Sequence, residues 1–257
     1  MKHRITIQSI TNQKRPSLRI VFLVAFLAFL SARPAHTYQT PMLSAEEIVG
    51  KAISAYASCK SYMDAGRVRT IFLTKLGRRT DIKPFSTAFV RPDAFRFEFQ
   101  SRRGEEEWNI YIVWRQGNSV KSWWTIKPEG RESNELSSAI AGATGVSSGS
   151  AHRIPALLMP DLIRGSSVKS LTGMKLLGEE EVETKSAYKI EGQDLRGNTE
   201  TLWIDKQRFL ILKVFEKRKF EPNATREGFE TETTTFYDPQ INEAVLAEKL
   251  AFNPPAK

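Results

Sequence analysis

The sequence has 257 residues, 40% of them hydrophobic, with 38 Lys and Arg against 29 Asp and Glu and a formal charge of +9. This composition excludes a disordered or collagen-like chain, and the apolar content suffices for a buried core. The single cysteine excludes an intramolecular disulfide and any multi-cysteine metal site. Residues 1–37 hold six of the basic residues and no acid, so 32 basic residues remain against 29 acidic ones, a net charge of +3. The remaining charge does not indicate a nucleic-acid partner.

The first 37 residues have the order of a secretory signal peptide. A basic segment, 1–19, precedes an uninterrupted run of 11 apolar residues at 20–30, and small and turn-forming residues follow at 31–37. A transmembrane helix needs about 20 apolar residues, so this run is too short to span a membrane. We therefore expect a signal peptide within residues 1–37 to be removed on export, and the residues leave cleavage after Ala32 and after Thr37 both open. Residues 38–257 would then form a single periplasmic domain, without a lipid anchor because no cysteine closely follows the run.

A helix is predicted at the start of the mature chain. Ser44-Ala-Glu-Glu47 is a capping box, in which the Ser and Glu side chains satisfy backbone amides of the first turn. Apolar residues then recur every three or four positions as far as Met63, which predicts one amphipathic helix of about five turns that ends before Gly66. Cys59 falls on its apolar face, a position typical of a buried, unreactive thiol.

From residue 67 the apolar period changes to two, which indicates strands. Phe95, Phe97 and Phe99 alternate with Arg96 and Glu98, so the three rings share one face. Strands are predicted at 67–73, 85–91, 95–99, 108–114, 119–125, 188–192, 200–204, 209–215 and 230–237. Turn residues at 116–118, 196–198 and 205–207 predict hairpins, because a parallel crossover needs a dozen or more residues.

One segment interrupts this pattern. Residues 133–152 are rich in Ser, Ala and Gly, and we expect a weak helix at 135–143 within an otherwise mobile stretch. A short apolar piece, 154–164, follows, which Pro155 would start and Pro160 would interrupt. We therefore predict that residues 127–165 form a helical, flexible insert within the single domain.

No arrangement of residues indicates catalysis. His152 is the one histidine left after cleavage at Thr37, and although Asp161 and several serines are near in sequence, no nucleophile elbow or oxyanion motif accompanies them. The acidic runs 105–107 and 179–181 are typical of solvated surface. No phosphate-binding glycine loop is present. We expect that the protein is not an enzyme and that it has no cofactor and no metal site.

The aromatic content of the strands leaves two interpretations open. Segments 108–114 and 209–215 are apolar on both faces, whereas a single antiparallel sheet usually buries one face. Either the helix of residues 44–63 fills the space beside the sheet as ordinary core, or the helices fill only part of it and a lipophilic ligand takes the rest.

Four short motifs, in their order along the chain, resemble the periplasmic lipoprotein-carrier family, LolA/LolB-like, of outer-membrane lipoprotein sorting. They are Phe89-Val-Arg-Pro-Asp-Ala-Phe95, Trp123-Trp-Thr-Ile-Lys-Pro128, Leu202-Trp-Ile-Asp205 and Leu250-Ala-Phe-Asn-Pro-Pro255. The resemblance spans nearly the whole mature chain and implies an α+β, mainly β fold. That fold is an incomplete, half-open antiparallel β-barrel that wraps an N-terminal amphipathic helix and a short helical lid, with an apolar cavity for acyl chains.

The resemblance also implies roles for particular residues. Arg91 matches the arginine that closes the lid in the carriers, and the insert at 133–152 is longer and richer in glycine than a carrier's lid. The expected cavity residues are Phe89, Phe95, Phe97, Phe99 and Trp114, and the expected lid residues are Leu157, Leu158 and Leu162. The expected cargo is a lipid or an acylated protein, exchanged by a monomer with a membrane-anchored donor or acceptor protein. The alternative is an envelope sensor or interaction module that transports nothing.

Overall fold

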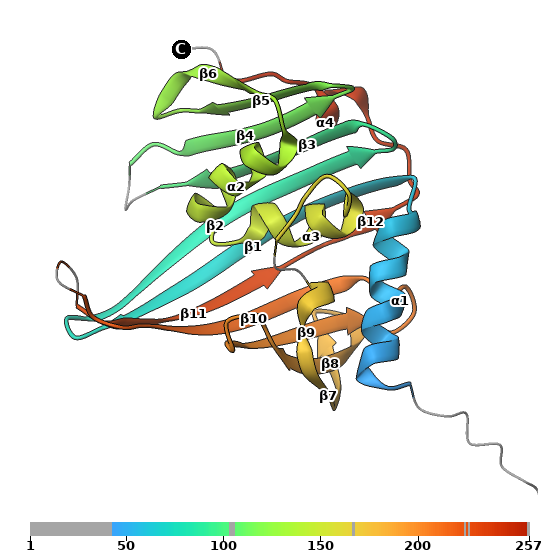
Figure 1. Ribbon diagram of the computed structural model, residues 1–257, viewed down its shortest axis with the longest axis vertical. Coiled ribbons are helices and arrows are strands. Elements are labelled where there is room, and N and C mark those ends of the chain that lie inside the picture. The colour runs from blue at the N-terminus through green and yellow to red at the C-terminus, as the bar shows by residue number, and fades with distance from the viewer. Residues whose placement is uncertain (1–42, 103–105, 166–167, 224, 226, 256–257) are drawn as a thin grey trace, which may run out of the picture. The chain divides into compact units, whose positions relative to one another are not determined.

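A single antiparallel sheet of twelve strands, open at both ends, carries three of the helices on one face (Figure 1). The computed structural model describes residues 43–102, 106–165, 168–223, 225 and 227–255, so the predicted signal peptide lies outside the described residues. The spatial order is β6-β5-β4-β3-β2-β1-β11-β10-β9-β8-β7, with β12 paired to β1. Because β6 and β7 end the series without pairing to each other, the predicted incomplete β-barrel with enclosed helices is confirmed.

The strands and helices have the following bounds. The strands are β1 (Ser61–Thr74), β2 (Gly77–Val90), β3 (Ala94–Ser101), β4 (Asn109–Gln116), β5 (Ser119–Trp124), β6 (Lys127–Ser133), β7 (Thr172–Val182), β8 (Lys185–Gln193), β9 (Thr199–Asp205), β10 (Ile211–Phe220), β11 (Phe229–Phe236) and β12 (Gln240–Ile241). The helices are α1 (Ala45–Ser58), α2 (Leu136–Val146), α3 (Ser150–Leu158) and α4 (Ala247–Leu250), with a 3-10 turn, η1, at Val168–Ser170. The three predicted hairpin turns are confirmed between β4 and β5, β8 and β9, and β9 and β10.

The first helix is shorter than predicted. Its capping box is present, but α1 ends at Ser58, and the chain is already in β1 from Ser61. The backbone amide of Lys60 donates to Asn242 Oδ1 at 2.7 Å, and the amide of Asn242 donates to the Ser61 carbonyl at 3.0 Å. Pairing with β2 and β12 therefore takes over residues whose apolar spacing alone would have continued the helix.

Three strands were not predicted: β12, which has only two residues, and β6 and β7, whose sequences lack a clear alternation. Residues 127–133, expected to belong to the insert, form β6 and pair with β5, so that boundary was wrong. Pro128 and Gly130 interrupt the pattern there. In β7 the register shifts twice, near Gly173 and Gly178, and each shift moves the apolar residues to the other face. The insert proper is α2 and α3, joined by a turn in which Ser148 and Gly149 have positive φ.

The core lies between the helices and the concave face of the sheet. Ile48, Ala52 and Tyr56 of α1 pack there with side chains of α2, α3 and the inward-facing positions of the strands. A smaller apolar cluster, around Trp203 and Leu212, lies on the opposite face. The strands form because alternate residues are apolar, and the helices seal the wider of the two apolar faces.

Gly66 of β1 has no room for a side chain, and we expect its replacement by Ala to be strongly destabilising. A Cβ at this position would lie 2.3 Å from Cζ of Phe85 and 2.5 Å from the carbonyl oxygen of Phe236. The backbone oxygen cannot turn aside, so Gly66→Ala should cost about 3 kcal/mol in urea unfolding. Gly50→Ala, with open space at the Cβ position, is the matched control and should not destabilise the protein. Equal stability of the two variants would contradict this packing.

Candidate functional site

The phenylalanines expected to line a cavity gather on the concave face of β2 and β3. Phe89 lies opposite Phe95 in the register, and Phe97 and Phe99 follow on the same face. Phe89, Phe95 and Phe97 are 0% exposed and Phe99 is 1% exposed. All four belong to one cluster with Leu157 and Leu158 of α3. The structure therefore brings the expected cavity and lid residues together, with helix side chains packed over the rings.

Two expected site residues lie elsewhere. Trp114 faces the other side of the sheet, because Val113 is the residue of β4 that lies opposite Phe97. Its indole Nε1 donates to the carbonyl of Leu250 at 2.7 Å, and its ring lies 5.6 Å from that of Phe252. Leu162 is 42% exposed, beyond the end of α3. The C-terminal segment thus covers Trp114, and the expectation that it joins the phenylalanines was wrong.

Arg91 joins the ends of two helices. Its Nε donates to the carbonyl of Cys59 at 2.7 Å, and its Nη2 donates to Ala57 at 2.6 Å and to Tyr56 at 3.2 Å. The same Nη2 donates to the carbonyl of Leu158, the last residue of α3, at 2.9 Å. One guanidinium group thus holds the C-terminal ends of α1 and α3 beside each other.

This contact suits the electrostatics of both helix ends. The last carbonyls of a helix lack intrahelical partners and carry partial negative charge. Neither α1 nor α3 has a basic residue in its last turn, so Arg91 provides the positive charge from outside. Lys83 acts in the same way at α2, where its Nζ donates to the carbonyl of Val146 at 2.8 Å and to Ser148 Oγ at 3.2 Å. Lys83 of β2 and Arg91, the residue that follows β2, therefore bind the C-terminal ends of α2 and α3.

A buried acid beneath α1 was not predicted from the sequence. Asp64 lies on the inward face of β1 and accepts a hydrogen bond from the hydroxyl of Tyr62 at 2.8 Å. Burial raises the pKa of Asp64 from 3.8 to about 7, and the Tyr62 hydroxyl offsets only part of this shift. Tyr56 of α1 lies 5.6 Å from Tyr62, ring to ring, and its hydroxyl accepts from the amide of Ile211 at 3.0 Å. Asp64 could have been noticed as the one acid at an apolar position of its strand.

His152 and Cys59 both form hydrogen bonds with backbone carbonyls. Nε2 of His152 lies 2.9 Å from the carbonyl oxygen of Arg164, so one ring nitrogen is occupied by the backbone. Cys59 is buried, its thiol donates to the carbonyl of Tyr56 at 3.2 Å, and burial raises the pKa of the thiol. Both side chains therefore serve the fold.

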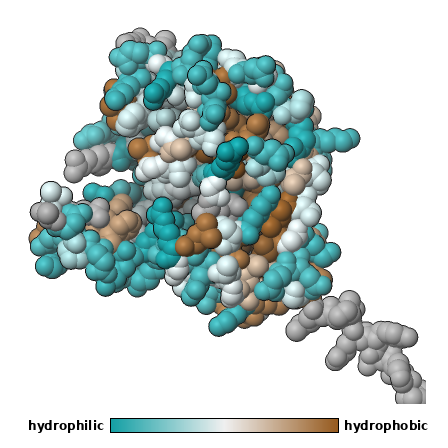
Figure 2. All heavy atoms as spheres, viewed as in Figure 1, coloured by the Kyte–Doolittle hydropathy of each residue, from teal (hydrophilic) through white to brown (hydrophobic). Residues whose placement is uncertain are grey.

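The larger surface hollows lie away from the phenylalanines. One of about 720 Å3 is lined by the outer parts of β2, β3 and β4, including Lys83, Arg102 and Trp108. Another of about 450 Å3 lies beside α3 and is lined by charged residues such as Arg153 and Arg218. Figure 2 shows the helix-bearing side, with hydrophilic residues over most of it and hydrophobic ones toward the side on which α1 lies. None of the helices within the described ranges is long and apolar enough to cross a membrane.

Comparison with known proteins finds distant structural likeness. No family model matches the chain, and no curated protein matches it. Similar solved structures include a LolA superfamily protein from Nitrosomonas europaea, at 13% identity over 82% of this chain and 98% of that one, with a TM-score of 0.32. The lipoprotein LppX from Mycobacterium tuberculosis has 12% identity over 79% of this chain and 97% of its own, with a TM-score of 0.42. A DUF1329 family protein from Desulfovibrio piger has 13% identity, the same coverage as the LolA protein and a TM-score of 0.37.

Proposed function

We propose that this protein is a periplasmic carrier or binding protein for a lipid or a lipidated protein, and that the cargo's acyl chain occupies the phenylalanine face once the insert lifts. The observation that supports it is the Arg91 contact. A single guanidinium group ties α3 to α1 directly beside a fully buried face of aromatic rings. No chemistry on a bound substrate is proposed.

The hydrogen bonds of Arg91 suit an opening in which α3 lifts away from the phenylalanine rings. Between Arg91 and α3 there is one hydrogen bond, to Leu158, whereas three bonds of Arg91 go to the end of α1. A hydrogen bond to a charged group contributes about 1.5–3 kcal/mol. Lifting α3 would uncover Leu157 and the rings below, and each methylene of an acyl chain bound there would gain about 0.8 kcal/mol. A chain of modest length can therefore replace the contacts that α3 gives up.

Arg91→Leu should tighten the binding of a fluorescent fatty-acid probe by about tenfold. In the wild type the closed form competes with the loaded form, so the apparent affinity is reduced by the small population of open protein. Losing a contact of about 1.5 kcal/mol, the lower end of that range, raises that population about tenfold. Arg91→Lys should give an intermediate result, because one ammonium group cannot span the carbonyls of two helices. Equilibrium titration of the probe checks both variants.

Native mass spectrometry of the protein from its own host tests the proposal directly. We expect a co-purified lipid or acylated peptide. Arg67→Leu, which removes an exposed arginine on the other face of β1, is the matched control and should bind the probe like the wild type. No co-purified lipid together with no uptake of the probe by any variant would refute the carrier proposal. Capture of a membrane-anchored protein without lipid would instead support a sensor or interaction module.

A further inference from the structure

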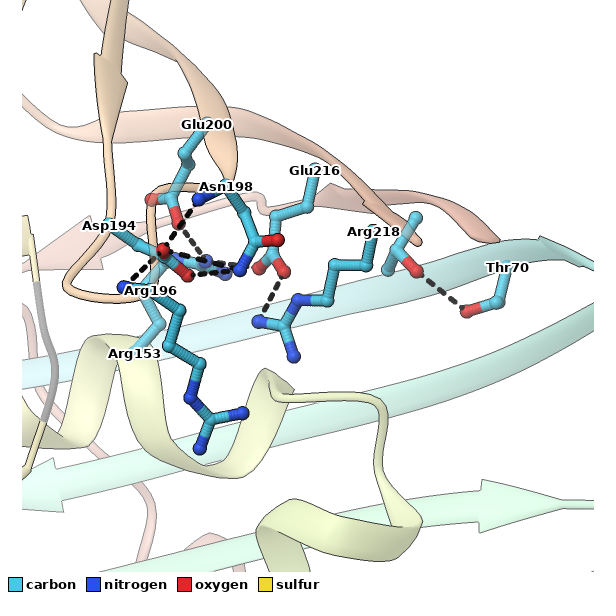
Figure 3. A network of polar contacts seen from close by, with 9 residues as sticks. Thr70, Arg153, Asp194, Arg196, Asn198, Glu200, Glu216 and Arg218 are labelled. Atoms are coloured by element: carbon cyan, nitrogen blue, oxygen red, sulfur yellow. Dashed lines mark hydrogen bonds and ion pairs between the residues drawn. The ribbon is translucent and has the colours of Figure 1, made fainter. Parts of the chain in front are cut away.

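Helix α3 has an arginine of its own, Arg153, which is largely buried and reaches the sheet at a point remote from Arg91. The side chain of Arg153 is 11% exposed. Its Nη2 donates to Glu200 Oε2 on β9 at 2.7 Å and also to Glu216 Oε1 on β10 (Figure 3). Arg153 therefore binds the insert to the half of the sheet opposite to the one that carries Arg91.

Without Arg153, the two glutamate side chains would be an unfavourable pair of like charges. Glu200 and Glu216 lie directly opposite each other in the register of β9 and β10, and each side chain is 9% exposed. Like charges in directly opposed positions destabilise a sheet, and desolvated carboxylates need a cationic partner. Arg218 lies 2.6 Å from Glu216, but its side chain is 40% exposed and reaches only that carboxylate. Arg153 is the cation that contacts both.

A proline in α3 separates the residue that contacts the two glutamates from the residue that contacts Arg91. Pro155 lies inside α3, has no amide hydrogen and so removes the hydrogen bond to the carbonyl of residue 151. Arg153 lies before this break, and Leu158, the residue held by Arg91, lies after it. The two halves of α3 therefore have separate attachments and a weakened connection.

We propose that Arg153, acting through the Glu200–Glu216 pair, is a second fastening of the insert, so that α3 opens first at its Leu158 end while its N-terminal half stays seated. The direction follows from what each opening leaves behind. Releasing Leu158 frees one neutral carbonyl, which water can satisfy. Releasing Arg153 leaves Glu200 without its cation and Glu216 with Arg218 alone, in directly opposed and nearly buried positions. The link between this opening and cargo binding rests on the proposed function. The attachment through Arg153 does not, because it belongs to the protein without bound lipid.

Amide hydrogen exchange on the full mature chain, without lipid, tests the proposal. Arg153→Met should raise the exchange of residues 151–154 at least tenfold and leave β3 within twofold of the wild type. Arg91→Leu should raise exchange at residues 157–163 by at least tenfold and leave 151–154 within twofold. Arg67→Leu should change neither. Wild-type exchange of 151–154 in Arg153→Met, or an equal rise in both halves in Arg91→Leu, would overturn the proposal.

If Arg153→Met does not fold, a triple variant tests the proposal in its place. Adding Glu200→Gln and Glu216→Gln removes the two opposed negative charges that Arg153 no longer neutralises and should restore folding. Exchange of 151–154 at least tenfold above the wild type in this variant supports the fastening, and wild-type exchange overturns it. Because lipid is absent throughout, a failed fastening is distinguishable from a failed carrier function, which native mass spectrometry reports separately.

Discussion

Asp64→Asn should stabilise the protein at pH 8 and leave it almost unchanged at pH 4. Burial raises the pKa of Asp64 from 3.8 to about 7, so the folded protein holds a proton that the unfolded chain has released. The resulting stability is fully present below pH 4 and is lost as the pH rises through 7. A shift of about three pKa units corresponds to about 4 kcal/mol, because one unit is worth 1.36 kcal/mol.

The asparagine does not titrate, and its amide oxygen still accepts the hydrogen bond of the Tyr62 hydroxyl. Thermal unfolding at pH 8 should therefore give a Tm on the order of 10 °C above the wild type. Asp81→Asn, at an exposed ion pair on β2, is the control and should shift the Tm by a degree or two at most. Equal Tm values of the wild type and Asp64→Asn at pH 8 would show that Asp64 ionises normally.

Phe97→Ala should cost about 4 kcal/mol in denaturant unfolding of the lipid-free protein. The ring is 0% exposed and lies between those of Phe85 and Phe99, at centroid distances of 6.0 Å and 6.3 Å. Removing a fully packed ring loses its transfer free energy and leaves a cavity. Leu162→Ala, at an exposed position, should stay within about 0.5 kcal/mol.

This variant also separates the two interpretations of the aromatic strands. A ring beside an empty lumen has few contacts to lose, and its removal would cost little beyond the exposed area. A loss near 1 kcal/mol would therefore favour a lumen that is already open. With the larger loss, benzene should raise the Tm of Phe97→Ala but not that of the wild type, since an apolar cavity of this kind binds such probes.

The sequence predicted the barrel well where a local pattern and its tertiary context agree. The alternation of Phe95, Phe97 and Phe99 is enough to place three rings on one face. Arg91 became visible only through the motif around it, because its four acceptors come from two distant segments. Trp114 was misassigned because β4 is apolar on both faces, and parity relative to Phe97 depends on register. Register is not encoded in the strand alone.

The charged network of α3 shows the opposite case. Glu200 and Glu216 occupy inward positions of strands whose other inward residues are apolar, such as Leu202 and Val214. The sequence alone shows two acids at apolar positions. It does not show what neutralises these two glutamates, because the cation, Arg153, lies on a helix some 50 residues away in the chain. Burial raises the pKa of Glu216, but Arg153 and Arg218 hold it below its ordinary value. Only the folded arrangement makes the pair acceptable.

Among the described residues, β6 and β7 are the strands at the two ends of the sheet, and both are poorly suited to accept another strand. In β6, Pro128 offers no amide hydrogen, Gly130 has a positive φ, and charged side chains flank them. In β7, the two register shifts bend the edge out of plane. Natural sheets avoid edge-to-edge aggregation by these means. The same features oppose the capture of an extended peptide by strand addition at these two edges.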